Sequence, residues 1–216
     1  LKDSLRTAKD MGIKSLTNID QYGLTLVLGG GEVSLLDITS AYSAFANEGV
    51  RNPATAILRI KDANGNTLEE FQSSGVTVIP QDIALTMSDI LSDNDARAPA
   101  FGQNSYLYFP GRDVAAKTGT TNDYRDAWII GYTPQISVGA WAGNNDNSPM
   151  EKRVAGFIIA PLWNAFMSEV LNNLDNEPFR GVRVKEDNMD SPPVLRGIWR
   201  GGENFVIDKI SGKLAT

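Results

Sequence analysis

Three apolar runs in the middle of the chain constrain its fold more than any other feature. They cover residues 113–119, 127–133 and 136–142, and short breaks separate them. The connection between the last two runs, Thr133-Pro134-Gln135, is tight enough to force neighbouring strands to run in opposite directions. An antiparallel sheet is therefore expected in this part of the chain.

A helical pattern follows these runs over residues 156–173. Six apolar residues fall on or near one face of this helix, and we expect that face to pack on the sheet. They are Phe157, Ile158, Leu162, Phe166, Val170 and Leu171. Strands followed by a helix that packs back on them predict an α+β fold, in which helices flank an antiparallel sheet.

Two helices are expected near the start of the chain. Residues 4–11 read as the end of a helix, with Gly12 just past it. Ser34 can cap a second helix, because Asp37 stands three residues further on, and Gly49 would close that helix.

The next stretch predicts a hairpin and a third helix. Residues 55–61 and 67–71 have the composition of strands, and Asn64-Gly65 between them is a strong hairpin signal. Residues 80–91 form an amphipathic helical pattern, and residues 92–112 read as polar and irregular. The side chains expected to point inward from this helix are Ile83, Leu85, Met87 and Ile90.

The composition changes after Pro178, which suggests a domain boundary. We expect a main portion over residues 1–177 and a small appended tail over residues 178–216, with short strands at Val182–Val184 and Phe205–Asp208.

The residue types that are missing exclude several kinds of chemistry. The 216-residue chain has no cysteine and no histidine, so disulfides, thiol catalysis, histidine metal sites and a Ser-His-Asp triad are ruled out. No metal site and no cofactor are expected. Its net charge of −6 argues against nucleic acid as a partner, since such partners bind basic surfaces. Lysine remains as a candidate group for proton transfer.

The tripeptide Lys117-Thr118-Gly119 is the main candidate for a functional site. Side chains alternate along a strand, so the hydroxyls of Thr118 and Thr120 would share one face while Gly119 lies on the other. Without a side chain, Gly119 lets another backbone approach closely. Lysine-threonine-glycine is one of three motifs of the serine acyl-transferases that react with penicillin.

A second candidate, the glycine run Gly29-Gly30-Gly31 before a helix, could in principle cradle a phosphate. Its pattern is neither Gly-x-Gly-x-x-Gly nor a Walker loop, so a nucleotide-binding function rests on this run alone.

Several long blocks resemble the second half of the transpeptidase domain of class A penicillin-binding proteins. Together they extend from about Met11 to Leu174. The matching blocks are Tyr22–Leu36, Thr39–Gly49, Lys117–Trp128, Gly131–Pro134 and Gly139–Asn144.

The resemblance implies a serine D,D-transpeptidase that cross-links peptidoglycan. A serine attacks the D-Ala-D-Ala end of a stem peptide, D-alanine leaves, and an amine from a neighbouring stem takes the acyl group. Penicillins and other β-lactams mimic the dipeptide and block the serine. The resemblance places this activity on the outer side of the bacterial cytoplasmic membrane, in a membrane-anchored parent protein that also carries a glycosyltransferase domain.

The resemblance also implies roles for individual residues. Lys117 would supply positive charge near the substrate carboxylate, and the hydroxyls of Thr118 and Thr120 would bind that carboxylate. The backbone N–H of Thr120 would be an oxyanion-hole donor. Gly119 and Thr121 complete the substrate-binding set, and the substrate would lie along the strand edge as an added strand. Arg125 and Asp126 are expected to form a local ion pair.

The chain departs from the family pattern at the nucleophile. No serine has a lysine three residues on, so the Ser-x-x-Lys motif is absent and the isolated chain should be inactive. Ser92-Asp93-Asn94 matches the second motif, Ser-x-Asn, but we interpret it as a turn at the end of a helix. The nucleophile would come from an N-terminal remainder of the same protein.

Two alternatives remain at this stage. In a D,D-carboxypeptidase or β-lactamase-like hydrolase, water would accept the acyl group instead of an amine. The other alternative is a non-catalytic cell-wall binding module, which the missing nucleophile favours.

Overall fold

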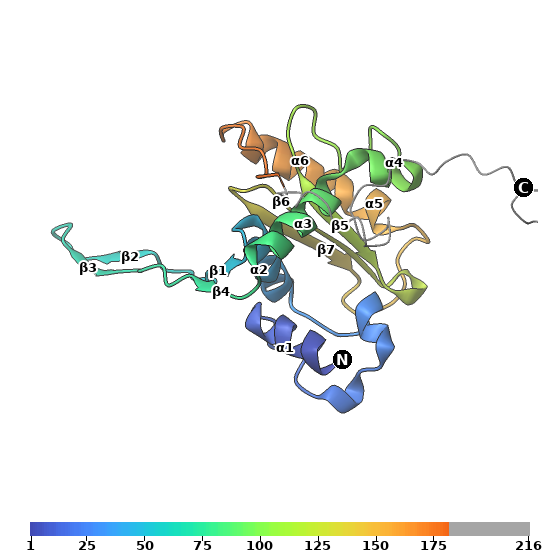
Figure 1. Cartoon of the computed structure of the whole chain (residues 1–216), viewed down its shortest axis with the longest axis horizontal. Helices are drawn as coiled ribbons and strands as arrows, with labels where there is room; N and C mark the ends of the chain where they lie inside the picture. The colour runs from blue at the N-terminus through green and yellow to red at the C-terminus, as the bar shows by residue number, and fades with distance from the viewer. Residues whose placement is uncertain (182–216) are drawn as a thin grey trace, which may run out of the picture. The chain divides into compact units, whose positions relative to one another are not determined.

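The computed structural model describes residues 1–181, and residues 182–216 lie outside the described part. The short strands expected at Val182–Val184 and Phe205–Asp208 therefore lie outside the described residues. Figure 1 shows the arrangement of the elements. The helices are α1 (Lys2–Asp10), α2 (Leu35–Ala46), α3 (Gln81–Ser92), α4 (Asn94–Phe101), α5 (Ala155–Ile158) and α6 (Ala160–Leu171). The strands are β1 (Val50–Arg51), β2 (Arg59–Lys61), β3 (Thr67–Glu70), β4 (Val76–Thr77), β5 (Ala115–Thr120), β6 (Asp126–Tyr132) and β7 (Ser137–Gly143).

The predicted antiparallel sheet is confirmed. It has the order β5-β6-β7, and both neighbouring pairs are antiparallel. The register places Lys117 opposite Ile130, and Ile130 opposite Gly139. Within the described residues β5 is an edge strand of this open sheet.

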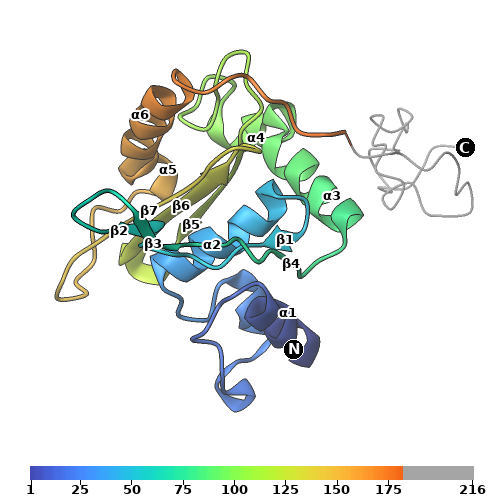
Figure 2. The ribbon, with the colours of Figure 1, turned by 90° about the vertical axis from the view of Figure 1, so that its left-hand side faces the viewer.

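Helices cover both faces of the sheet (Figure 2). On one face, α2 approaches β7 so closely that a Cβ at Gly139 would lie 2.0 Å from the Thr39 hydroxyl. On the other face, a Cβ at Gly131 would lie 2.3 Å from the Trp163 ring of α6. Glycine at these two positions therefore allows the helices to pack closely on the sheet. An antiparallel sheet with helices on both faces confirms the predicted α+β architecture.

The prediction of one helix over residues 156–173 is wrong in two respects. It is broken into α5 and α6 at Ile159, because Pro161 lacks an N–H and fits only the first turn of a new helix. The expected core face is also wrong for Phe157, Leu162 and Phe166, which are 64%, 64% and 53% exposed. Leu171 is buried, as predicted. The other buried side chains, which pack with it on the apolar face of the sheet, are Ala155, Ile159, Ala160, Trp163 and Met167.

The helix α3 is confirmed, but its inward face is not the predicted one. Ala84 and Ser88 are buried, whereas Ile83 and Ile90 are exposed and Leu85 and Met87 are half-buried. The small side chains let α3 come close to its neighbours, and the Ser88 hydroxyl lies 3.1 Å from the buried Tyr132 hydroxyl.

The stretch 92–112 is not wholly irregular, because it contains α4. Asp93 caps this helix by accepting a hydrogen bond from the Ala96 N–H at 2.8 Å. Pro99 stands inside this helix, where it removes one backbone hydrogen bond because it has no N–H.

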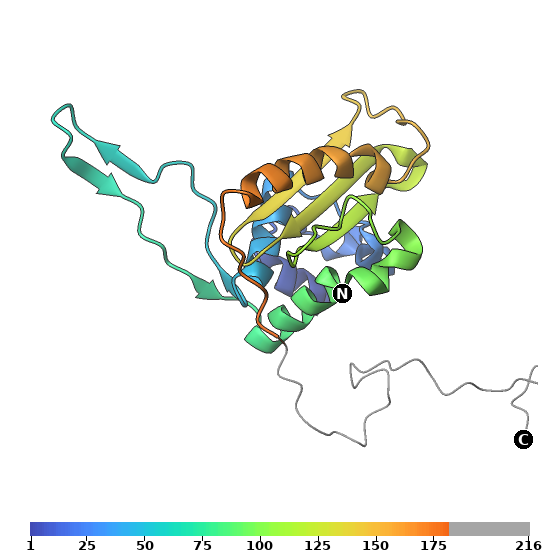
Figure 3. The ribbon, with the colours of Figure 1, turned by 90° about the horizontal axis from the view of Figure 1, so that it is seen from above.

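Two predicted features near the N-terminus are confirmed. Ser34 caps α2 by accepting from the Asp37 N–H at 3.0 Å. The hairpin at Asn64-Gly65 consists of β2 and β3, whose residues are all exposed, and the pair β1–β4 lies at its base. Figure 3 shows this hairpin away from the three-stranded sheet.

The first residues of the predicted tail contact the rest of the described chain. Phe179 packs edge-on against Tyr132 with ring centroids 5.6 Å apart, and Arg180 forms an ion pair with Glu48 at 2.8 Å. The boundary between residues 177 and 178 stays a prediction.

Candidate functional site

The alternation predicted along the Lys-Thr-Gly strand appears in the register of β5. Thr118 and Thr120 stand opposite Ile129 and Ala127, which belong to the core under α5 and α6. Lys117 stands opposite Ile130 and therefore lies on the other face of the strand. Ala115 and Ala116 are buried at the start of β5, whereas Lys117 is exposed.

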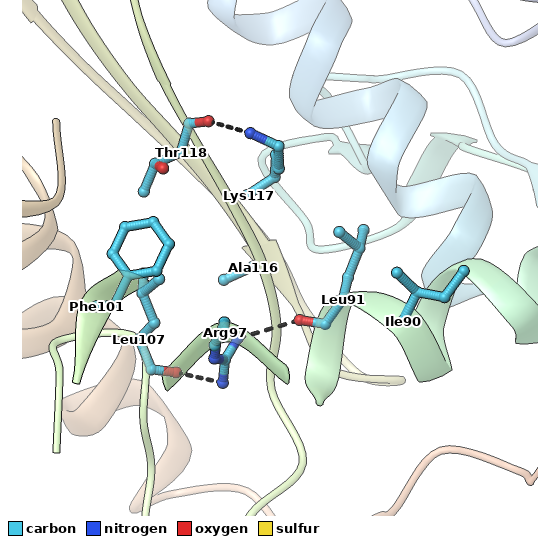
Figure 4. Close-up of a pocket in the computed structure, with 8 residues that line it drawn as sticks. All are labelled: Ile90, Leu91, Arg97, Phe101, Leu107, Ala116, Lys117 and Thr118. Carbon is cyan, nitrogen blue, oxygen red and sulfur yellow. Dashed lines mark hydrogen bonds between the residues drawn. The ribbon is translucent and has the colours of Figure 1, made fainter. Parts of the chain in front are cut away.

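A pocket of about 160 Å³ opens beside this strand (Figure 4). Ala116, Lys117 and Thr118 of β5 line one side, and residues of α3, α4 and the following loop line the other. These are Ile90, Leu91, Arg97, Phe101 and Leu107. Lys117 and Thr118 therefore both lie at a concave surface.

The Lys117 ammonium is held at this edge. Its Nζ donates to the Thr118 carbonyl at 2.6 Å, in the same strand. The side chain is exposed, so its charge can still reach an anionic ligand that enters the pocket.

Arg97 is a second cation at the pocket, and sequence reasoning missed it because α4 was not expected. Its guanidinium donates to the carbonyls of Leu91 at 3.1 Å and Leu107 at 2.9 Å, which joins α3, α4 and the loop before β5. Burial lowers the pKa of Arg97, and the charge of Asp93 opposes this effect. An arginine stays protonated under these conditions, so it adds positive charge to this wall of the pocket.

The Thr120 hydroxyl lies apart from the pocket lining. Its Oγ1 accepts a hydrogen bond from the Ala155 N–H at 2.9 Å, at the start of α5. Val154, the residue at the N-cap of α5, makes no side-chain cap of its own. Thr120 thus caps α5 from another element, and its O–H remains able to donate.

The predicted ion pair between Arg125 and Asp126 is wrong. The Arg125 guanidinium donates to the Asn147 carbonyl, while the Asp126 carboxylate accepts from the Thr121 hydroxyl at 2.9 Å and the Trp141 indole at 2.9 Å. Arg125 stands before β6 with helical backbone angles, φ −81° and ψ −33°, whereas Asp126 is the first residue of that strand, and the two side chains bind different partners. The Trp141 contact comes from β7, so neither residue spacing nor local propensity could have found it.

The Ser92-Asp93-Asn94 triplet forms the junction between α3 and α4. Asp93 is the cap of α4, and the Asn94 amide donates to the Gln103 carbonyl at 3.0 Å. The Ser92 hydroxyl bonds back to the Asp89 carbonyl at 3.3 Å. These bonds agree with the interpretation of this triplet as a helix-terminal turn.

Two of the three glycines, Gly30 and Gly31, pack closely against their own loop. A Cβ at Gly30 would lie 2.9 Å from the Thr25 carbonyl oxygen, and a Cβ at Gly31 would lie 2.6 Å from Leu16. Close packing thus accounts for glycine at positions 30 and 31.

Over residues 1–181, no three carboxylate, histidine or cysteine side chains are grouped as a metal ion would need. No helix in this part of the chain is long and apolar enough to cross a bilayer.

The chain is similar to proteins of one family. The family model described as the penicillin binding protein transpeptidase domain matches residues 10–168. Penicillin-binding protein 1A of Aquifex aeolicus is 35% identical over 177 residues, which cover 81% of this chain and 23% of that protein. Penicillin-binding protein 1A of Neisseria lactamica is 30% identical, with 76% and 20% covered. The chain thus spans about a quarter of the length of these curated relatives.

A solved structure agrees with the sequence matches. The PonA1 protein from Mycobacterium tuberculosis, in complex with penicillin V, superposes with a TM-score of 0.69 and 25% identity. The match covers 81% of this chain and 51% of that one.

Proposed function

The chain belongs to the transpeptidase domain family of penicillin-binding proteins, in class A, and from this premise we propose that it forms the substrate-binding wall of a serine D,D-transpeptidase. Its substrate is the D-Ala-D-Ala end of a peptidoglycan stem peptide. The domain works on the outer side of the cytoplasmic membrane, where peptidoglycan lies.

One observation carries this proposal: Lys117 and Thr118 meet at a pocket beside the exposed edge of β5. A peptide can add to this edge as another antiparallel strand, because its backbone groups are not covered by a further strand of the described residues. The carboxylate at the end of the peptide then meets positive charge from Lys117, with Arg97 behind it.

The residues of β5 take the following roles. The Thr118 hydroxyl donates to the substrate carboxylate from the pocket side. The Thr120 hydroxyl donates from further along the strand, since its oxygen already accepts from Ala155. The Thr120 backbone N–H stabilises the oxyanion, a contribution worth on the order of 3 kcal/mol. A Cβ at Gly119 would meet only the Trp128 Cβ, at 3.5 Å, so the space beside Gly119 is open. The substrate backbone can occupy that space because glycine has no side chain.

The attacking serine comes from residues outside this chain. None of its serines has the Ser-x-x-Lys spacing. The 216-residue chain alone should therefore not be labelled by a fluorescent penicillin, whereas the full-length protein should be labelled at a serine outside it. Covalent labelling of the isolated chain would overturn this part of the proposal.

The test of the site is Lys117→Ala in the full-length protein. Loss of the ammonium removes the electrostatic attraction for the carboxylate, and acylation by penicillin should slow by about tenfold or more. Thr67→Val is a matched control, because Thr67 is exposed on the β2–β3 hairpin and outside the pocket. An unchanged acylation rate in Lys117→Ala removes Lys117 from the mechanism.

The products separate the transpeptidase from its alternatives. A stem peptide supplied with an acceptor amine should give a cross-linked dimer. Release of D-alanine without dimer would instead indicate a D,D-carboxypeptidase or a related hydrolase. Binding of cell-wall peptide without any acylation would indicate a non-catalytic binding module.

A further inference from the structure

The connection between β5 and β6 is closed by side-chain hydrogen bonds as well as backbone ones. The Thr121 hydroxyl donates to Asp126 Oδ2 at 2.9 Å and accepts from the Asp126 N–H at 2.8 Å. The Thr121 N–H also donates to the Asp126 carbonyl at 3.1 Å. Three bonds thus join the residue that follows the substrate-binding strand to the first residue of the next strand.

The second carboxylate oxygen of Asp126 is bound from β7. The Trp141 indole N–H donates to Asp126 Oδ1 at 2.9 Å, and the Trp141 ring lies beside Trp128 with centroids 6.2 Å apart. Both oxygens of one carboxylate are therefore used, one toward the end of β5 and one toward β7. Hydrogen bonds to a charged acceptor are stronger than those between neutral groups.

The residues between Thr121 and Asp126 adopt a conformation that needs such support. Asp123 and Tyr124 have φ values of 62° and 58°, in the left-handed region that residues other than glycine rarely adopt. The Met150 N–H donates to the Tyr124 carbonyl at 2.9 Å, and Arg125 donates to the Asn147 carbonyl. A backbone of this kind persists only where its surroundings determine it.

These bonds matter for the site because β5 has a paired neighbour on one side only among the described residues. The end of such a strand is free to shift unless another contact holds it, and Thr118 to Thr120 stand at that end. We propose that Asp126 is a positioning residue, which uses Thr121 and Trp141 to hold the end of β5 in the geometry that acylation requires. This inference rests on the proposed function of β5.

Asp126 does not line the pocket, so its effect on the reaction is indirect. Displacing a reacting group by about 1 Å can slow a reaction by about a hundredfold. Loss of the Asp126 contacts should therefore reduce the acylation rate constant more than the affinity for penicillin before acylation. A role limited to stability would change the unfolding midpoint and both kinetic quantities together.

The experiment compares Thr121→Val with Thr121→Ser in the full-length protein. Valine has nearly the shape of threonine but cannot bond Asp126, and serine retains the hydroxyl. Thr121 does not line the pocket, and its hydroxyl is already bonded to Asp126. We therefore expect Thr121→Val to lower the saturating acylation rate constant by about tenfold or more, with the dissociation constant for penicillin little changed. Thr121→Ser should restore the rate to near that of the unmodified protein. Trp141→Phe, which keeps the ring but not the N–H, should lower the rate in the same direction.

A spectroscopic signal in the 216-residue chain tests the contact itself. The Trp141 indole N–H should exchange slowly with solvent in the unmodified chain and rapidly in Asp126→Ala, as followed by NMR. Equal exchange rates in the two chains would contradict the hydrogen bond on which the proposal depends.

The kinetic outcomes separate this inference from the function on which it rests. If Lys117→Ala slows acylation but Thr121→Val does not, the positioning role is wrong and the proposed function stands. If Thr121→Val lowers the rate, the affinity and the unfolding midpoint together, the role is structural only and the inference also fails. If Lys117→Ala has no effect, the proposed function itself fails.

Discussion

At the scale of single residues, the surroundings of Tyr132 determine the pKa of its hydroxyl. Tyr132 lies at the end of β6, where its ring is fully buried between Tyr42, Phe45 and Phe179. Burial raises the pKa of its hydroxyl to about 12, and the hydrogen bond between this hydroxyl and that of Ser88 opposes the rise. The phenol is therefore a neutral part of the core.

The raised pKa of Tyr132 predicts a loss of stability at high pH. The unfolded chain releases this proton near pH 10.0 and the folded chain only near pH 12. The stabilisation is complete below pH 10 and is lost as the pH rises toward 12, at a cost on the order of 1–3 kcal/mol. Urea unfolding of the chain at pH 8 and pH 11 measures it.

Tyr132→Phe is the control for this pH effect. It removes the titrating group, so the part of the alkaline destabilisation due to Tyr132 should disappear. The Ser88 hydroxyl still bonds the Ala84 carbonyl, which limits the loss at pH 8 to about 1 kcal/mol. An unchanged slope of stability against pH would contradict the assignment to Tyr132.

At the scale of elements, helix α6 shows what apolar periodicity can predict. It predicted that a helix is present, but it did not predict which face of the helix is buried. Two sets of apolar residues follow helical spacing in this segment. Trp163 and Met167 are the side chains that pack on the sheet. The indole N–H of Trp163 donates to the Val138 carbonyl at 3.0 Å, and its ring lies over Gly131. Leu162 and Phe166 then point away from the sheet.

The two faces of α6 should differ sharply in their contribution to stability. Trp163→Ala removes a fully buried ring and should lower the free energy of unfolding by about 3–5 kcal/mol. Phe166→Ser, on the outer face, should change the stability of the isolated chain by less than about 1 kcal/mol. Urea denaturation of both variants is the measurement, and equal losses would contradict the assigned faces.

The described part of the molecule combines a sheet-centred body with a hairpin that adds little to it. The body has two groups of buried residues, one around Trp163 and Ile129 and one around Ala44 and Met11. All residues of β2 and β3 are exposed, and their closest links are within the hairpin, such as the pair of Arg59 and Glu70.

The hairpin should therefore be dispensable for the stability of the body. Replacing residues 53–74 by an Asn-Gly turn joins β1 directly to β4, which are already antiparallel neighbours. We expect the unfolding temperature to fall by no more than about 4 °C, which corresponds to about 1 kcal/mol. A larger fall, measured by thermal unfolding, would show that the hairpin supports the body.

Local patterns in the sequence determined most of the elements and indicated Lys117-Thr118-Gly119 as the candidate site. Some features depend on only a few neighbouring residues, so they can be predicted from the sequence alone. They are the cap at Ser34, the turn at Asn64-Gly65 and the tight connection that begins at Thr133. The alternation along β5 likewise placed Thr118 and Thr120 on one face of the strand and Gly119 on the other. The family resemblance rests on long blocks of the same kind, and the comparisons confirm it.

Tertiary structure alone decided what depends on distant partners. The inward faces of α3 and α6 depend on which side chains fit against the sheet, and Pro161 divided a helix that the apolar spacing left continuous. Arg97 lies at the pocket because α4 places it there, and Asp126 accepts a hydrogen bond from Trp141 of the neighbouring strand β7 instead of pairing with Arg125. Hydrogen-bond satisfaction and close packing are settled between elements, and a local pattern contains no information about which partner will be in reach.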